Sequence, residues 1–135
     1  MKVFVDTSVW ISYLSGHKTK SAVHLARLLD TGNQIYSLPI IIQEVLQGIL
    51  NDKDFGLIHD KLEATQILPF EFDAAAEAAR LYRTLRKKGL TINTVDVQIA
   101  STCIVHGIHL LTEDKGFSLI AKNSALKLFK IEVKN

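Results

Sequence analysis

Four acidic residues that lie far apart in the chain have the type and placement to bind a divalent metal ion. They are Asp6, Glu44, Asp96 and Asp114. Asp6 follows the apolar run 3–5 and Asp114 follows a second such run, 110–112, so each stands where a buried strand is expected to end. The carboxyl ends of the strands of an open α/β sheet meet at one crevice, where ligands bind. Carboxylates gathered there would raise each other's pKa unless a cation neutralised them, which predicts a metal site and phosphate chemistry.

Each of the three aspartates also has a simpler interpretation when it is taken alone. Asp6 could cap a helix that begins at Thr7. If Asn93 is the N-cap of a later helix, Asp96 is its third residue and could complete a capping arrangement. Asp114 could be a turn residue or a cap. These alternatives stay open for the single residues, and the combination of all four is what favours a metal site.

Glu44 is harder to explain as a structural residue. It lies in a helix expected over 39–50, most of whose side chains are apolar. An ionised carboxylate buried there would be costly without a cation, a hydrogen-bond network or an opening to water. Gly48, one turn later, leaves space where another group can approach. The structural alternative is an ion pair between Glu44 and an arginine of the segment 72–88.

Strand and helix patterns alternate along the chain. Strands are expected at 2–5, 35–37, 66–68, 109–111 and 126–133. Helices are expected at 7–15, 21–30, 39–50, 54–64, 72–88 and 94–106, with a short one after Asp114. This alternation predicts the α/β class: one domain over residues 1–135, built as an α/β/α sandwich with a mainly parallel sheet.

The composition is that of an ordinary globular protein. Hydrophobic residues make up 47% and charged residues 22% of the chain, and the net charge of +2 is too small to indicate nucleic-acid binding by itself. Cys103 is the only cysteine and is expected to be a small buried hydrophobe. The densest apolar stretch, 38–42, is far too short to span a membrane, and the N-terminus does not resemble a secretory signal. We therefore expect a cytoplasmic protein with no membrane contact.

The side chains available exclude several other kinds of site. Oxygen-rich acidic sites suit Mg²⁺ or Mn²⁺, whereas zinc prefers thiol and imidazole ligands. The five histidines show no spacing typical of metal ligands. The chain has no phosphate-binding P-loop, no dinucleotide-binding glycine motif and no nucleophilic-serine motif. Mg²⁺, with Mn²⁺ as an alternative, is the cofactor that these residues predict.

Basic residues cluster at the end of the segment 72–88. They are Arg80, Arg83, Arg86, Lys87 and Lys88. Cations at a helix C-terminus interact favourably with the helix dipole, so a solvated basic helix end is one interpretation. The other is a surface that contacts the phosphate backbone of a nucleic acid beside the acidic crevice.

Four blocks of sequence resemble the PIN-domain family, and within it the small VapC-like toxins of toxin–antitoxin pairs. The blocks are VFVDTSVWI, PIIIQEVLQGI, VDVQIAST and LLTEDKGF, and they occur in the family's order and approximate spacing over essentially the whole chain. The resemblance implies a PIN-like fold and a metal-dependent endoribonuclease that hydrolyses RNA, leaving a 5′-phosphate and a 3′-hydroxyl. It also implies a homodimer, a VapB-like antitoxin as partner, and transfer RNA as the commonest substrate class.

The resemblance also assigns roles to the matching residues of this chain. Asp6, Glu44, Asp96 and Asp114 correspond to the catalytic, metal-binding acidic cluster, and Ser8 and Thr112 to hydroxyl positions that support it. Because Mg²⁺ usually takes only one or two direct carboxylates, we assign Asp6 and Asp96 as the direct ligands. Glu44 and Asp114 would then orient bound water or hold a second ion.

One departure from the family's pattern concerns the number of carboxylates. Many members carry a further aspartate at the position of Gly116, so a second metal ion is in doubt here. Two other functions are weighed against the nuclease. One is a PIN fold that does not cleave and serves as a binding module, and the other is a receiver-type signalling domain with an acidic Mg²⁺ pocket. The receiver type requires paired acidic residues after the first strand, where this chain has only Asp6 followed by Thr7 and Ser8.

Overall fold

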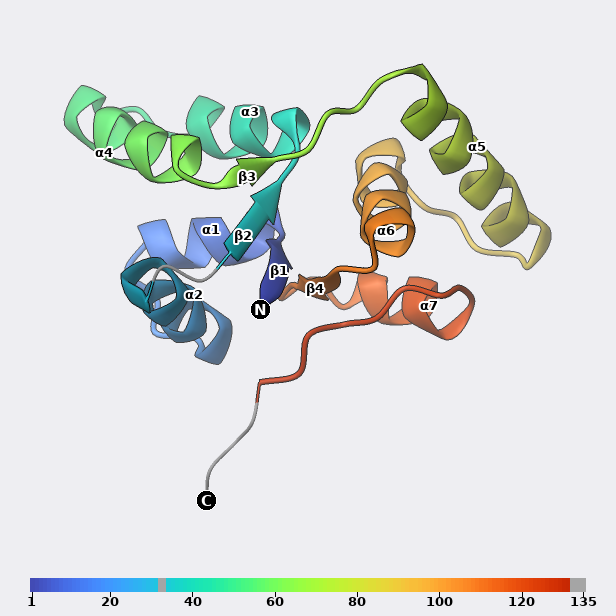
Figure 1. Ribbon diagram of the computed structural model, residues 1–135. Coiled ribbons are helices and arrows are strands. Elements are labelled where there is room, and N and C mark those ends of the chain that lie inside the picture. The colour runs from blue at the N-terminus through green and yellow to red at the C-terminus, as the bar shows by residue number, and fades with distance from the viewer. Residues whose placement is uncertain (32–33, 132–135) are drawn as a thin grey trace.

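A parallel sheet forms the centre of the protein. The computed structural model describes residues 1–31 and 34–131. Its strands are β1 (Lys2–Val5), β2 (Gln34–Ser37), β3 (Gln66–Ile67) and β4 (His109–Leu111). They lie in the order β3-β2-β1-β4, and each neighbouring pair is parallel (Figure 1). This confirms the mainly parallel sheet. The receiver-type alternative is wrong, because that fold pairs its first strand with its third, whereas here β1 lies between β2 and β4.

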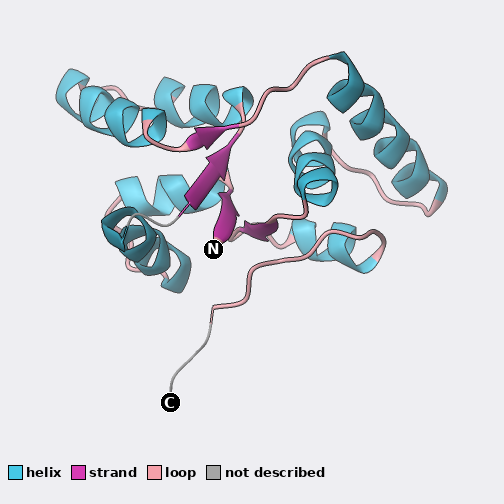
Figure 2. Ribbon diagram, in the orientation of Figure 1, coloured by secondary structure: helices cyan, strands magenta, loops and turns pink. Residues whose placement is uncertain are grey.

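Helices connect the strands and cover the sheet. They are α1 (Thr7–Leu14), α2 (Lys20–Thr31), α3 (Pro39–Gln47), α4 (Asp52–Glu63), α5 (Phe72–Lys87), α6 (Thr94–His106) and α7 (Gly116–Lys122). In Figures 1 and 2, α1 and α2 lie on one side of the strands, and α6 and α7 lie on the other. Parallel strands need such crossover helices, and the arrangement confirms the predicted α/β/α fold class.

Burial explains why β1 occupies the middle of the sheet. Val3, Phe4 and Val5 are all fully buried, as expected for a strand that has helices on both faces. Trp10, on α1, is also completely buried and therefore belongs to the core. Cys103 is buried as predicted, and burial raises the pKa of its thiol. The polar residue that follows β1 thus emerges from a rigid, well-packed strand.

Two predicted elements differ from the structure. The prediction of a strand at 126–133 is wrong for residues 126–131, where Leu128 forms only an isolated parallel bridge with Leu110. The reason is that β4 is only three residues long, so its ladder ends after two hydrogen bonds, from Leu110 N to Lys127 O and from Phe129 N to Leu110 O. Residues 132–133 lie outside the described residues. Helix α3 ends at Gln47 rather than at residue 50, with Gly48 as its C-cap.

None of the helices within the described residues is long and apolar enough to cross a membrane. The longest, α5, has 16 residues and a basic last turn, whereas a membrane-spanning helix needs about 20 mostly apolar residues. The expected cytoplasmic location stays a prediction.

Candidate active site

The four acidic residues line a single cleft with a volume of about 430 Å³. Asp6 directly follows β1, and Asp114 lies three residues beyond the end of β4. Glu44 projects from α3, which follows β2, and Asp96 lies in the first turn of α6. The parallel strands end at the same edge of the sheet, and this is why residues so distant in sequence meet. The predicted convergence is confirmed, while the metal-binding and catalytic roles of these residues stay predictions.

Asp6 is the most deeply buried of the four carboxylates, with only 5% of its surface exposed. Its Oδ2 accepts hydrogen bonds from Ser8 Oγ (2.9 Å) and from Thr112 Oγ1 (2.8 Å). Burial raises the pKa of Asp6, and the bonds from Thr112 and Ser8 oppose part of that rise. Asp6 stands at the N-cap position of α1, but its side chain makes no capping hydrogen bond. The capping alternative therefore does not explain this carboxylate, whereas Ser8 and Thr112 hold it as the resemblance to the PIN-domain family implied.

Asp96 is half-buried and is held by the residue that caps its helix. Asn93 is the N-cap of α6, as expected, and its Oδ1 accepts from Asp96 N (2.8 Å). Asn93 Nδ2 in turn donates to Asp96 Oδ2 (3.0 Å). The pKa of Asp96 is raised to about 6, chiefly by burial and further by the negative charges of Asp114, Asp6 and Glu44. The capping role is real, but the carboxylate also faces its acidic neighbours.

Glu44 is half-buried and receives a hydrogen bond from Thr7 Oγ1 to its Oε1 (2.9 Å). The predicted alternative of an ion pair with α5 is wrong for the described residues, where the arginine of α5 that forms an ion pair, Arg80, binds Glu77. Sequence reasoning did not single out Thr7. A hydroxyl next to Asp6 was the only signal for it, because its partner lies 37 residues away.

Asp114 is exposed at the mouth of the cleft and is held by its own turn. Gly116 N donates to Asp114 Oδ1 (2.8 Å), and Asp114 N donates to Thr112 Oγ1 (3.0 Å). The turn interpretation was therefore correct, and it is compatible with a place in the cleft. A Cβ atom at residue 116 would lie 3.1 Å from Asp114 Oδ1. Glycine at position 116 thus allows close contact between the backbone of this turn and the Asp114 carboxylate.

A second carboxylate beside Asp114 was missed by sequence reasoning. Glu113 accepts hydrogen bonds from Ser12 (2.8 Å), Thr19 (2.7 Å) and Ser21, and its backbone N donates to Ser8 Oγ (3.0 Å). Burial alone would raise the pKa of Glu113, but the three hydroxyl donors together lower it. Glu113 therefore ties α1, α2 and the connection between them to the segment that carries Asp114.

Replacing Glu113 with glutamine should lower the stability of the protein. Hydrogen bonds to a charged acceptor stabilise more than neutral ones, so we expect a loss of about 1–3 kcal/mol in the free energy of unfolding at pH 7. The lowered pKa means that the wild-type stabilisation is present above the ordinary value of 4.5 and is lost as the pH falls below it. Urea unfolding at several pH values measures both effects.

Glu71→Gln is a suitable control for this measurement, because Glu71 is exposed and its side chain makes no capping bond. A Glu113→Gln protein that is as stable as the control at pH 7, with the same pH dependence, would show that these hydrogen bonds contribute nothing to the fold.

The donor atoms in the cleft fit Mg²⁺ or Mn²⁺. They are carboxylate and hydroxyl oxygens, the ligands that these hard cations prefer over the thiols and imidazoles that suit zinc. Within the described residues, no three His, Cys, Asp or Glu side chains already stand in the geometry of a metal-binding group. Mg²⁺ does not require this, because it usually retains several waters and takes one or two carboxylates. The raised pKa values of Asp6 and Asp96 also indicate a site where a cation would be favourable.

Comparisons with known proteins agree with this geometry. The PIN domain family matches residues 3–123. VapC ribonuclease Mb1587 of Mycobacterium bovis is 30% identical over 129 residues, which cover 93% of this chain and 96% of that protein. Ribonuclease VapC1 of Rickettsia felis is 32% identical over 120 residues, which cover 83% of this chain and 84% of the relative.

Solved structures show the same fold. A DNA-bound VapBC from Salmonella typhimurium superposes with a TM-score of 0.77 at 16% identity, over 96% of this chain and 97% of the other. FitAcB from Neisseria gonorrhoeae has a TM-score of 0.70 at 25% identity, over 95% and 96%. Such likeness at low identity supports the fold, while the family match and the curated relatives extend over most of the sequence. The chain therefore belongs to the PIN-domain family, and within that family it is VapC-like.

Proposed function

We propose that this protein is a Mg²⁺-dependent endoribonuclease that hydrolyses RNA phosphodiester bonds as the toxin of a toxin–antitoxin pair. The observation that carries the proposal is the meeting of Asp6, Glu44, Asp96 and Asp114 in one cleft. The names of its curated relatives as ribonucleases support the choice of RNA as substrate. By resemblance to the family, the proposed substrate class is transfer RNA.

The proposed roles follow from how each carboxylate is held. Asp6, fixed by two hydroxyl donors, and Asp96, fixed by Asn93, would bind the metal directly. When bound, Mg²⁺ lowers the pKa of coordinated water and offsets the negative charge that develops on the phosphate. Glu44 and Asp114 would accept hydrogen bonds from water and orient it toward the phosphorus atom.

The proposed partner is a VapB-like antitoxin. VapBC-5 from Mycobacterium tuberculosis, which shares this fold, is a member of a family of toxin–antitoxin systems. In this chain a groove of about 530 Å³ runs between α1, α3 and α4 and includes Glu44, Val45 and Leu57. Because Ile11 and Glu44 line both this groove and the acidic cleft, a segment bound in the groove would reach the carboxylates. We also propose a homodimer, as the resemblance implies.

Metal dependence provides the direct test. The purified protein should cleave RNA in the presence of Mg²⁺ or Mn²⁺ and stop when EDTA is added, and zinc should not replace them. Mg²⁺ should also raise the melting temperature at pH 7, because a ligand that binds only the folded state stabilises it. Cleavage that continues unchanged in EDTA would remove the metal from the proposal. Binding of RNA without cleavage, in Mg²⁺ and in Mn²⁺, would favour the non-cleaving PIN fold instead.

A further inference from the structure

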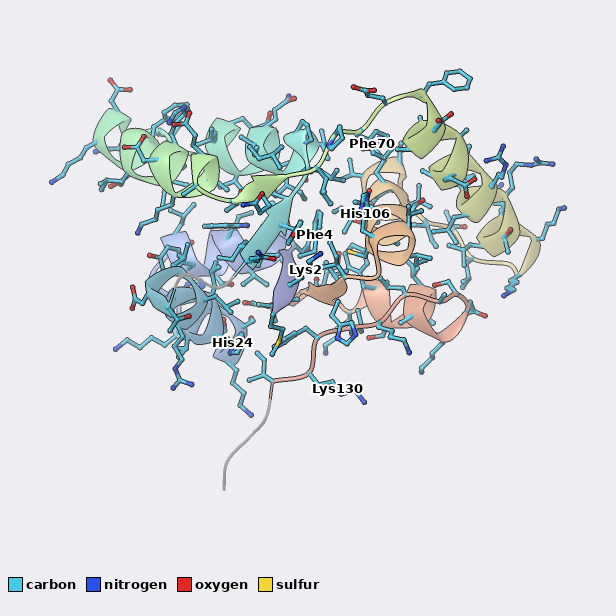
Figure 3. All side chains as sticks on the ribbon, in the orientation of Figure 1. Lys2, Phe4, His24, Phe70, His106 and Lys130 are labelled. Atoms are coloured by element: carbon cyan, nitrogen blue, oxygen red, sulfur yellow. The ribbon has the colours of Figure 1, made fainter. Side chains whose placement is uncertain are left out.

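A cavity of about 360 Å³, distinct from the acidic cleft and from the groove beside it, lies between α5 and α6. Phe70, Tyr82, Arg83 and Gln98 line it. Thr94 lines both this cavity and the acidic cleft, so the two are neighbours on either side of the first turn of α6. Figure 3 shows Phe70 in the connection between β3 and α5, beside α6. A group bound in this cavity would therefore lie next to the carboxylates.

The shape of the cavity arises from the alanine-rich sequence of α5. Ala75, Ala78 and Ala79 line its wall, and their small side chains leave room between two helices that otherwise pack closely. The aromatic rings of Phe70 and Tyr82 add flat apolar surfaces, and both residues are half-buried. Flat aromatic surfaces of this kind bind nucleobases by stacking, whatever the base.

Two polar side chains of the cavity are free to meet a ligand. Within the described residues, Arg83 and Gln98 form no side-chain hydrogen bond or ion pair, whereas Arg80, one turn earlier on α5, is paired with Glu77. The amide of Gln98 can both donate to and accept from the edge of a base. The guanidinium of Arg83 is exposed and can bind a phosphate in a bidentate manner. The chemistry around the cavity is thus that of a nucleotide site.

We propose that this cavity binds one unpaired nucleobase of the RNA, beside the phosphodiester that is cleaved. The base stacks on Tyr82 and Phe70, Gln98 hydrogen-bonds its edge, and Arg83 contacts the adjoining phosphate. The proposal rests on the proposed ribonuclease function and adds the residues that receive one base of the substrate. A stable contact with a second copy of the chain needs about 800 Å² on each partner, so such a contact would have to extend well beyond this cavity.

Tyr82→Leu tests the stacking because it preserves an apolar side chain and removes the ring. With intact RNA we expect kcat/KM to fall ~10-fold or more, the range found when one base–aromatic stack is lost. The same measurement is repeated on RNAs that carry one abasic nucleotide at successive positions around the cleavage site. When the abasic nucleotide is the one that occupies the cavity, the kcat/KM of the wild-type protein should fall by a similar factor. On that RNA, Tyr82→Leu should lower kcat/KM only slightly further. Gln98→Leu should reduce the differences in kcat/KM among RNAs that carry different bases at that position.

The control is Tyr36→Leu, which removes a half-buried tyrosine from β2, outside the cavity, and should leave RNA cleavage unchanged. The proposal is overturned if Tyr82→Leu cleaves intact RNA as fast as the control. It is also overturned if its defect is equally large on every abasic RNA, since the residue then acts on the fold. Sedimentation measures the oligomeric state of both variants. If Tyr82→Leu loses cleavage because it dissociates into monomers, the cavity is a contact between two copies of the chain and the proposal is overturned.

A binding measurement separates this inference from the proposed function. Single-stranded RNA with the fluorescent base 2-aminopurine is titrated in EDTA, where no cleavage is expected. Stacking in the cavity should quench the fluorescence at one position, and Tyr82→Leu but not Tyr36→Leu should remove the quenching. If the wild-type protein cleaves no RNA in Mg²⁺ but the quenching is present, the ribonuclease proposal fails and the base pocket stands. Absence of quenching at every position overturns the pocket even if cleavage is normal.

Discussion

Replacing Asp96 with asparagine should abolish RNA cleavage, a loss of ~1000-fold or more, or about 4 kcal/mol of transition-state stabilisation. Asp96 is one of the two proposed direct ligands, and an amide cannot supply the negative charge that binds the cation. The fold should tolerate the change, because asparagine has the same shape and can still accept the hydrogen bond from Asn93 Nδ2. It also removes a charge that Asp6, Glu44 and Asp114 repel. The metal-free variant should therefore melt at the same temperature as the parent or higher.

The charge on Asp96 should also change how the stability of the metal-free protein depends on pH. The pKa of Asp96 is about 6 in the folded protein and near 3.8 in the unfolded chain, so the folded state binds more protons between these values. The free energy of unfolding of the metal-free wild type should thus decrease as the pH rises from about 4 to about 6. In Asp96→Asn this contribution is absent, so the free energy of unfolding should decrease less over the same pH range. Mg²⁺ should raise the melting temperature of the wild type at pH 7 more than that of the variant.

Asp73→Asn is the matched control for Asp96→Asn, because Asp73 is an exposed aspartate in the first turn of α5 and carries a comparable helix-dipole contribution. It should lose at most about 1 kcal/mol of stability and retain its cleavage activity. An Asp96→Asn protein that is destabilised to a similar degree and still cleaves RNA would show that Asp96 is only a helix-capping residue.

Glu44→Gln should lower RNA cleavage by ~100-fold or more, about 3 kcal/mol, while the protein remains folded. Glutamine occupies the same space, and its carbonyl oxygen can still accept from Thr7 Oγ1. The change removes one negative charge from the cleft, so the repulsion on Asp96 should also decrease. The measurement is the cleavage rate per folded molecule, together with a melting curve. Growth arrest on expression without an antitoxin offers a simpler version of the same test.

The control for this variant is Glu63→Gln, at the exposed end of α4, which changes the net charge equally but lies outside the cleft. A Glu44→Gln protein that arrests growth and cleaves RNA like Glu63→Gln would refute a catalytic role for Glu44. If the variant instead unfolds easily and keeps the full rate per folded molecule, the carboxylate serves the fold through Thr7.

Local sequence determined the strands and helices that carry the site, because their signals lie within a few residues. The apolar run 3–5 formed β1, and Asn93 capped α6 through a hydrogen bond to a residue three positions away. The convergence of four carboxylates could also be predicted, since parallel strands must end at one edge of the sheet. The sequence could not distinguish a carboxylate that binds within its own helix start or turn from one that lines the cleft. Asp96 and Asp114 do both.

Only the tertiary structure decided the contacts between residues that are distant in the chain. Glu113 binds Ser12 and Ser21, which are 101 and 92 residues away, and local sequence carries no signal for such a pairing. The expected strand at 126–133 depended on the length of its partner β4, which its own apolar pattern could not reveal. Similarly, the choice of Thr7 rather than an arginine of α5 as the partner of Glu44 follows from the packing of α1 against α3. Periodicity thus determined which side chains face inward, and the packing of whole elements determined which of them meet.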